Sequence, residues 1–485
     1  MLDQSFTAYH FNEIFQIERR KGNIRKEYFP EPYLAVLEEG HRLNDVIREL
    51  KSVKRTEWTD EQKQEYKETK EAIKENQKER RKEESKWLEV IADKVNDPRF
   101  RITLDTIDLD DKTGYTVPNE VEYLFVMKTL QANLKKVFKV QQANRHRIMT
   151  QVKRLMNEST PKYIIRTDVH HFYESILQDR LLEMLKGNTL LSKMSVRFIW
   201  QILEEYERKK DTEEPKGLGV PRGVGVSAYL SEIYLRGVDE SIKHRPEVVF
   251  YVRYVDDIFI ILSHLPIGTT LEEYYDGLRD EFAALGLSLM DPNNPEQKKK
   301  LLLEDFHTYL KNKETKQGNF NYLGYNLKWL RSGGESGTRL ITKFGLSDDK
   351  KKKLFRRLNN AFVHFEEKTK YSLSEARMDL RDSLRMIAGN YRLTKSKSGI
   401  KAGIYYSNDL LTEVGELKTF TKFVHNRKIK VYSEVLKGMP ERDQYIAGIK
   451  AMVKQFDFQK SWKERKCYTM ADKRIREISQ WLSKE

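Results

Sequence analysis

The stretch that decides the fold is VVFYVRYVDDIFIIL, residues 248–262. Two apolar runs rich in β-branched and aromatic residues, 248–254 and 258–262, flank the adjacent aspartates Asp256 and Asp257. Each run has the composition of a buried strand, so the stretch predicts a β-hairpin with both carboxylates at its turn. Like charges this close raise each other's pKa, as does burial. A pair of divalent metal ions is therefore expected there, although Asp is also an ordinary turn residue.

Composition narrows the class of protein. The chain has 485 residues, 39% of them hydrophobic and 34% charged, which predicts a globular protein of two to four domains. A formal net charge of +15 together with 25 Tyr and 22 Phe favours a polyanionic partner, although solubility alone also explains a basic excess. We expect no membrane association, because no apolar run is long enough for a span and no signal-peptide core is recognised. The single cysteine, Cys467, leaves no internal disulfide and predicts a reducing, cytoplasmic location.

A second carboxylate ends another apolar strand. The segment YIIRTD, 163–168, predicts a strand that delivers Asp168 at its carboxyl end and continues into HHFYESI, 170–176. The segment GLGVPRGVGVSAYLSEIYL, 217–235, follows after a mainly helical stretch. Its glycines allow close backbone approach, and a helix is expected from Ser227 onward.

The remaining segments have clear local patterns. Long charged helices are expected within 41–96, where a solvated surface is the simple interpretation and docking of a protein or RNA the alternative. Further expected elements are a hairpin within 101–117, helices from Asn119, from Asn144 to Met156 and over 271–285, a strand at 286–289, a hairpin at 320–330, a basic helix from Leu346 and a mostly helical remainder.

These carboxylates suit metal-assisted nucleotidyl transfer. The α-phosphate under attack is already negative, so Mg²⁺ ions must neutralise it, activate the primer 3′-oxygen and hold the leaving pyrophosphate. Asp168 and Asp256 are the predicted bridging ligands of two Mg²⁺ ions about 3.5–4 Å apart, with Mn²⁺ as a possible substitute. We expect Asp257 to be a weaker ligand and a backbone carbonyl near Val169 to complete one site.

Residues from about 120 to 345 resemble the fingers and palm of a reverse transcriptase. Five blocks carry the resemblance in the family's order, and they are Asp168 with HHFYESI, GVPRGVGVSAYLSEIYL, the Tyr-x-Asp-Asp of Tyr254 to Asp257, GLSL followed by lysines, and the primer-grip motif FNYLGY. The resemblance implies an RNA-directed DNA polymerase that binds an RNA template, a DNA product and deoxynucleoside triphosphates.

The resemblance also implies an α+β right-hand polymerase fold with fingers, an antiparallel-sheet palm and a helical thumb. The expected domains are a helical charged extension at 1–97, fingers and palm at 98–345 with a second fingers segment at about 177–216, a basic thumb at 346–395 and a helical C-terminal region at 396–485.

The motifs assign further roles to single residues. Tyr173 lies five residues after Asp168, where the family places an aromatic ring that excludes a 2′-hydroxyl; core packing is the simpler interpretation of a lone Tyr. Arg145 belongs to a cationic helix face that could hold phosphates or could simply be solvated. The other predicted nucleotide-binding residues are Arg222, Gly223 and Lys299, and the predicted primer and template residues are Tyr254, Tyr322, Leu323, Gly324, Tyr325, Lys350 and Arg356.

Some positions depart from the family pattern. Arg222 stands where the family has Gln, and Ala228 where it has Pro. An insertion displaces the lysine of the fourth block, so Lys298, Lys299 and Lys300 are all candidates for the acid on the pyrophosphate side.

The amino-acid sequences of these motifs are most similar to those of bacterial antiphage-defence and abortive-infection reverse transcriptases. The opening segment 2–23 and GIYYSN at 403–408 resemble the type 3 defence-associated group, which implies a non-coding RNA template, a second reverse transcriptase as partner and a possible homo- or hetero-oligomer. Two alternatives stay open. One is template-independent or protein-primed DNA synthesis of the abortive-infection type, and the other is a non-catalytic RNA-binding scaffold.

Overall fold

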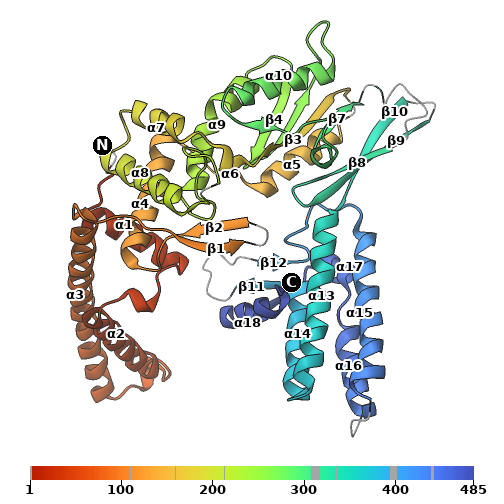
Figure 1. Cartoon of the computed structure of the whole chain (residues 1–485). Helices are drawn as coiled ribbons and strands as arrows, with labels where there is room; N and C mark the ends of the chain where they lie inside the picture. The colour runs from red at the N-terminus through yellow and green to blue at the C-terminus, as the bar shows by residue number, and fades with distance from the viewer. Residues whose placement is uncertain are drawn as a thin grey trace. The chain divides into compact units, whose positions relative to one another are not determined.

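The computed structural model describes residues 3–109, 112–141, 143–158, 160–211, 213–306, 308, 317–334, 337–393, 401–437 and 442–484. The chain forms two compact units, each containing helices and strands (Figure 1). The first unit consists of Met1–Ala143 and Ile165–Leu301, and the second of Asn144–Ile164 and Leu302–Glu485. No helix in the described ranges has both the length and the apolar character needed to cross a bilayer.

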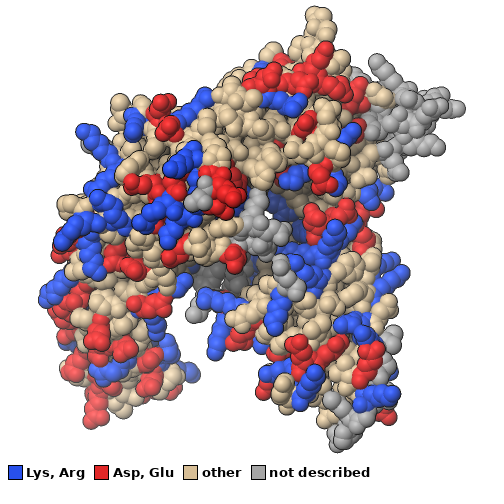
Figure 2. Space-filling model, in the orientation of Figure 1, with Lys and Arg blue, Asp and Glu red and all other residues tan. Residues whose placement is uncertain are grey.

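The first unit begins with the expected charged helices. Its N-terminal helices are α1 (Ala8–Lys21), α2 (Glu31–Leu50) and α3 (Asp60–Asn96). They are joined by an aromatic cluster, in which the Trp87 ring on α3 contacts the rings of Phe15, Phe29 and Tyr33. Acidic and basic side chains are interspersed over the exposed faces of α2 and α3 (Figure 2). This mixed surface is what the solvated-helix interpretation predicts.

A hairpin and four helices follow in the first unit. Strands β1 (Asp105–Leu109) and β2 (Lys112–Thr116) pair antiparallel as expected, while Asp110 in their predicted turn lies outside the described residues. The helices are α4 (Val121–Phe138), α6 (Phe172–Ser175), α7 (Gln178–Gly187) and α8 (Lys193–Lys209).

A sheet carries the two aspartate motifs. Its strand order is β4-β5-β3-β6, and the β4–β5 and β3–β6 pairs are antiparallel. Helix α9 packs on β4, and α10 packs on β6. The elements are β3 (Tyr163–His170), α9 (Ser227–Lys243), β4 (Val248–Tyr254), β5 (Asp257–Leu262), α10 (Leu271–Ala283), β6 (Ser288–Leu289) and α11 (Pro295–Lys298).

The turn between β4 and β5 has a strained backbone that a buried arginine stabilises. Tyr254 pairs with Asp257, so Val255 and Asp256 form a two-residue turn. Val255 has φ 62°, a conformation that favours Gly and is costly for a β-branched side chain. The Arg253 guanidinium, only 7% exposed, donates a 2.7 Å hydrogen bond to the Val255 carbonyl. Arg253 therefore fixes the backbone of the turn that carries the paired aspartates.

Two carboxylates on α9, the buried Asp239 and the half-buried Glu232, hold Arg253 in place. Its Nη2 lies 2.7 Å from Asp239 Oδ2 and 2.9 Å from Glu232 Oε2. The Tyr251 hydroxyl donates to the other oxygen of Asp239 at 2.6 Å. Because Arg253, Asp239 and Tyr251 are buried, the charges of Arg253 and Asp239 depend on their partners.

The second unit contains two small sheets among helices. Strands β8, β9 and β10 form one sheet in the order β10-β9-β8, and β11 pairs with β12 and β13 in the other. The elements are α5 (Arg145–Met156), β7 (Leu302–Asp305), β8 (Gln317–Tyr322), β9 (Tyr325–Gly334), β10 (Gly337–Leu346), α13 (Asp348–Thr369), α14 (Leu373–Ala388), β11 (Asn390–Leu393), β12 (Lys401–Gly403), α15 (Lys418–Lys430), α16 (Arg442–Lys454), α17 (Phe458–Glu464), β13 (Cys467–Met470) and α18 (Asp472–Leu482).

Two features of this organisation were not expected. The C-terminal region is mostly helical, as expected, but it also contributes strands to a small sheet, in which β11 pairs in parallel with β13 and antiparallel with β12. These strands are three or four residues long, too short for a periodic signal. Helix α5 was expected within the fingers, yet it and the β8–β10 sheet group with the basic helix α13 in the second unit.

The Arg253 network predicts a large effect on stability. Replacing Arg253 with Met keeps the volume but leaves the buried Asp239 and the half-buried Glu232 without their cation, so the free energy of unfolding should fall by about 3–5 kcal/mol. Urea denaturation of the purified protein measures this. Arg42→Met is the matched control, because Arg42 pairs with Glu39 on the exposed surface of α2, and it should change the free energy of unfolding little. Equal losses in both variants would show that the network does not stabilise the turn.

Candidate active site

The sheet brings the three aspartates together. Asp168 lies near the end of β3 and is 5% exposed, Asp256 lies in the hairpin turn, and Asp257 begins β5. The backbone N–H of Val169 donates to the Asp256 carbonyl at 3.1 Å, so the two motifs are direct neighbours. Asp168, Val169 and Asp256 line one cleft of about 270 Å³. Its lining is completed by His170, His171, Phe172, Arg222, Met290, Glu296, Gln297 and Lys300.

Two cations contact these carboxylates. Lys300 Nζ lies 3.0 Å from Asp168 Oδ2, and Arg166 Nη2 lies 2.6 Å from Asp257 Oδ1. Burial raises the pKa of Asp256, and the nearby Asp168 carboxylate raises it further. Burial also raises the pKa of Asp257, although the Arg166 guanidinium acts in the opposite direction. The ionised form of Asp256 would therefore gain from an added cation.

The carboxylates offer the hard oxygen ligands that Mg²⁺ prefers, and burial makes a divalent cation favourable there. Within the described ranges, no group of three or more His, Cys, Asp or Glu side chains is arranged so that it could hold a metal ion by itself. Mg²⁺ in proteins commonly keeps several waters and is bound by one or two carboxylates together with substrate phosphates. Asp168 and Asp256 would hold the ions from both sides of the cleft, and the ions would supply charge neutralisation at the reacting phosphate.

The structure distinguishes the candidate lysines by their contacts. The Nζ of Lys299, the lysine named for nucleotide binding, pairs with Glu296 at 3.1 Å on the surface. Lys300 is the one that reaches Asp168 and lines the cleft. The short helix α11, capped by Asn294, sets which of the consecutive lysines faces the aspartates, and this register is not visible in a run of identical residues.

The glycine-rich segment places Arg222 at the same cleft. Arg222 lines it together with Asp168 and Asp256, and its guanidinium also lies 5.2 Å from the centre of the Tyr173 ring. Gly223 has φ 100°, and a Cβ there would lie 2.6 Å from the Tyr115 carbonyl oxygen. Gly223 thus allows close packing against β2, whereas the neighbouring Arg222 contributes its side chain to the cleft.

The predicted primer-grip residues form the β8–β9 turn in the second unit. Leu323 and Gly324 occupy the two turn positions, with φ 41° and 76°, while Tyr322 and Tyr325 pair across the turn. Arg145 Nε donates to the Leu323 carbonyl at 2.7 Å. Arg145 thus contacts the predicted primer-grip turn within the second unit, whereas the aspartates belong to the first.

Lys350 completes a cationic cluster at this turn. The Tyr325 ring has Arg145 and Lys350 within 5.6 and 5.2 Å of its centre. Burial and the repulsion from Arg145 lower the pKa of Lys350 to about 7, while Asp409 acts in the opposite direction. Lys350 Nζ donates to the Ser407 carbonyl at 3.0 Å. The GIYYSN segment, residues 403–408, therefore contacts the cationic cluster of Arg145 and Lys350 through Ser407.

Two other predicted residues have simpler surroundings. Tyr254 is the last residue of β4 and pairs with Asp257 across the hairpin. Arg356 is exposed on α13, whose upper part carries a concentration of Lys and Arg side chains (Figure 2). This surface agrees with the expectation of a basic helix.

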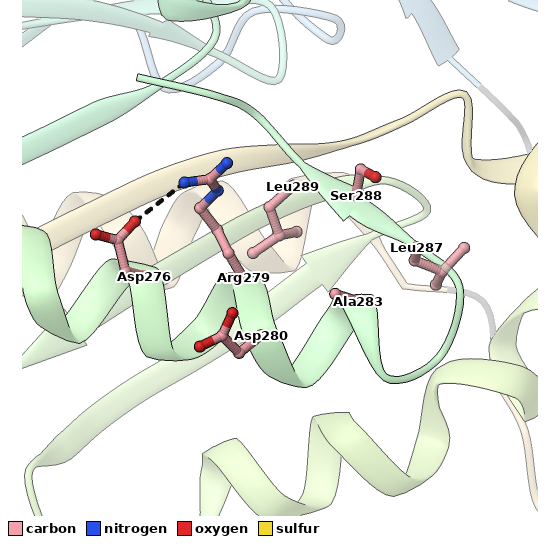
Figure 3. Close-up of a pocket in the computed structure, with 7 residues that line it drawn as sticks. All are labelled: Asp276, Arg279, Asp280, Ala283, Leu287, Ser288 and Leu289. Carbon is pink, nitrogen blue, oxygen red and sulfur yellow. Dashed lines mark hydrogen bonds and ion pairs between the residues drawn. The ribbon is translucent and has the colours of Figure 1, made fainter. Parts of the chain in front are cut away.

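A second cavity, of about 320 Å³, lies between α10 and β6 (Figure 3). Arg279 spans it and pairs with Asp276 at 3.1 Å. Its lining residues, none of them predicted for the site, are Asp276, Arg279, Asp280, Ala283, Leu287, Ser288 and Leu289.

Comparison with known proteins identifies the domain. Residues 120–327 match the family described as reverse transcriptase (RNA-dependent DNA polymerase). The chain carries a reverse transcriptase domain. Its enzyme class is RNA-directed DNA polymerase, a nucleotidyltransferase, as the motif order predicted. The mixture of helix and sheet in the chain is consistent with the right-hand polymerase fold.

Solved structures that the chain resembles include telomerases from Candida species. Apo telomerase from Candida tropicalis shares 14% identity with a TM-score of 0.35, covering 80% of this chain and 70% of that one. The same telomerase truncated from the C-terminal domain shares 13% identity with a TM-score of 0.33, and the match covers 54% of this chain and 69% of that one. Candida albicans telomerase in complex with a TWJ fragment of telomeric RNA shares 11% identity with a TM-score of 0.35, and the match covers 80% of this chain and 65% of that one. No curated protein matches the chain.

The raised pKa of Asp256 predicts opposite effects on stability and on metal binding. A carboxyl whose pKa is higher in the folded state destabilises the fold above that pKa and ceases to do so as the pH falls below it. At pH 7 without divalent ions, Asp256→Asn should therefore raise the free energy of unfolding by about 0.5–1 kcal/mol, allowing for partial exposure. Thermal unfolding measures the change.

The same variant should lose its response to metal. Mg²⁺ should raise the Tm of the wild type, because a ligand of the folded state stabilises it, and should raise that of Asp256→Asn much less. Asp276→Asn, at an exposed position on α10, is the control and should respond as the wild type does. A full Mg²⁺ response in Asp256→Asn would contradict the assignment of Asp256 as a ligand.

The pKa of Lys350 predicts a pH-dependent affinity for nucleic acid. Binding a phosphate favours the protonated amine, so above pH 7 the free enzyme must take up a proton to bind. Affinity for a primer–template should then fall by up to about tenfold per pH unit. Fluorescence anisotropy between pH 6.5 and 8.5 checks this.

Two variants separate this effect from general charge. Lys350→Arg keeps the charge at all these pH values and should bind with little pH dependence. Lys352→Met, which removes an exposed cation of the same helix, should weaken binding modestly and keep the pH dependence of the wild type. A pH dependence that survives in Lys350→Arg would show that another group titrates.

Proposed function

We propose that the protein copies an RNA template into DNA by two-metal nucleotidyl transfer at Asp168, Asp256 and Asp257. The observation that carries the proposal is the junction of β3 with the β4–β5 turn, where the N–H of Val169 meets the Asp256 carbonyl. Carboxylates from both motifs meet in one cleft at this junction, as two bridging Mg²⁺ ions would require.

Each residue has a distinct proposed task. Asp168 and Asp256 hold the ions, and Asp257, already paired with Arg166, acts as a weaker ligand. Lys300 lies beside Asp168, where an ammonium group can neutralise the triphosphate or protonate the leaving pyrophosphate. When bound, the metal ions lower the charge barrier to attack by the primer 3′-oxygen. Tyr173 is proposed to exclude the 2′-hydroxyl of ribonucleotides.

Primer extension tests the polymerase assignment. With an RNA template, an annealed DNA primer, deoxynucleotides and Mg²⁺, the wild type should extend the primer. Asp168→Asn and the double variant Asp256→Ala, Asp257→Ala should lose at least about a thousandfold in rate, because the charge-neutralising ions lose their ligands. Asp276→Asn should retain activity. Extension by the folded double variant at the wild-type rate would refute the assignment.

The finer proposal is a role in bacterial antiphage defence with a non-coding RNA as template. It is supported by the resemblance of 2–23 and GIYYSN, 403–408, to type 3 defence-associated reverse transcriptases, and by the contact of that second segment with Lys350 in the cationic cluster. Sequencing of the nucleic acid that copurifies with the full chain tests it. One abundant non-coding RNA with complementary DNA is expected, whereas a random sample of cellular RNA would contradict the proposal.

A further inference from the structure

Arg222 is held between an acidic side chain and an aromatic ring. Its Nε and Nη2 donate to Glu174 Oε1 at 3.2 and 2.9 Å, and Nη2 also lies 3.2 Å from Oε2. The same guanidinium lies 5.2 Å from the centre of the Tyr173 ring. A guanidinium forked onto a carboxylate has a fixed plane. Glu174 therefore orients the group that contacts the ring.

The backbone makes this arrangement rigid at both ends. The N–H of Val220 donates to the Tyr173 carbonyl at 2.8 Å, and the N–H of Tyr115 donates to the Arg222 carbonyl at 2.7 Å. These two bonds join residues 173–174 to the glycine-rich segment and join that segment to β2. Because the backbone is fixed by these bonds, the position of the Tyr173 ring depends on its side-chain contacts.

Space beside Tyr173 leaves the ring dependent on its contacts. A cavity of about 130 Å³ adjoins it, lined by Ala143, Ala228, Ser231, Glu232, Tyr254 and Val255. Its volume is several times that of one water, about 30 Å³, so an unrestrained ring has room to move. The Phe172 ring lies 5.7 Å from the Tyr173 ring, and the Arg222 guanidinium contacts the Tyr173 ring at 5.2 Å.

We propose that Glu174 is a positioning residue for sugar selection, which acts by holding Arg222 against the Tyr173 ring. This inference rests on the proposed role of Tyr173 as the ring that excludes a 2′-hydroxyl. A ring held in one position rejects ribose through a steric clash, and a ring that can move into the adjoining cavity rejects it less. Arg222, where the family has Gln, thereby takes part in specificity.

The test compares deoxynucleotide and ribonucleotide incorporation. In single-nucleotide extension by the full chain, Glu174→Gln should lower the ratio of kcat/KM for dNTP over rNTP by about fivefold to tenfold, as expected for loss of one forked ion pair. The change should come mainly from faster ribonucleotide use. Glu214→Gln is the matched control, because Glu214 lines the same neighbouring cleft as Glu174 and Arg222, and it should leave the ratio unchanged.

A double variant shows whether Glu174 acts through the ring. Tyr173→Ala should abolish most of the discrimination, and adding Glu174→Gln to it should cause no further loss. If Tyr173→Ala keeps the wild-type ratio, the proposed function of Tyr173 fails. If Tyr173→Ala loses discrimination while Glu174→Gln keeps it, only the role of Glu174 fails.

Arg222→Gln guards against a variant that does not fold. It installs the family's residue, removes the contact with the ring and should lower the ratio as Glu174→Gln does, with the Tm of each variant confirming the fold. If instead Glu174→Gln lowers KM for both nucleotide types equally and leaves the ratio unchanged, Glu174 is merely the counter-ion of a phosphate-binding Arg222. That result would overturn the inference.

Discussion

The buried guanidinium of Arg253 is the constraint on which the site depends. It is paired with Asp239 and Glu232 on α9 and donates to the carbonyl of Val255. Val255 adopts φ 62°, at a cost of roughly 1–2 kcal/mol for a residue with a Cβ. The network holds this turn in place, so the strain is balanced by interactions outside the cleft. The paired aspartates are consequently presented by a rigid support and not by a mobile loop.

Cations accompany the aspartates at the active site. Lys300 accompanies Asp168 and Arg166 accompanies Asp257. For Asp256 the leading influences are burial and the repulsion of Asp168, which together raise its pKa. A divalent ion is the natural complement to such a group. The same burial that makes Asp256 unfavourable in the fold thus makes it suitable for binding a metal, as is common for functional sites.

The elements that carry the aspartates were predictable from the sequence, because local residue patterns determine them. The apolar runs around Asp256 and Asp257 specify a hairpin, and the strand before Asp168 specifies the second carboxylate. Arg253 also leaves a signal, as a charge inside a buried strand, but its partners on α9 depend on packing. The lysine facing Asp168 depends on the register of a single helical turn, and β11 pairs with β13 from far along the chain. Neither is encoded by local periodicity.

The most direct test of the account is anomalous diffraction from crystals of the full chain bound to primer–template, Mn²⁺ and a non-hydrolysable deoxynucleotide analogue. The account predicts two manganese peaks about 3.5–4 Å apart, both within coordination distance of Asp168 and Asp256 oxygens. Manganese bound elsewhere, with neither carboxylate as a ligand while the nucleotide occupies the cleft, would contradict it.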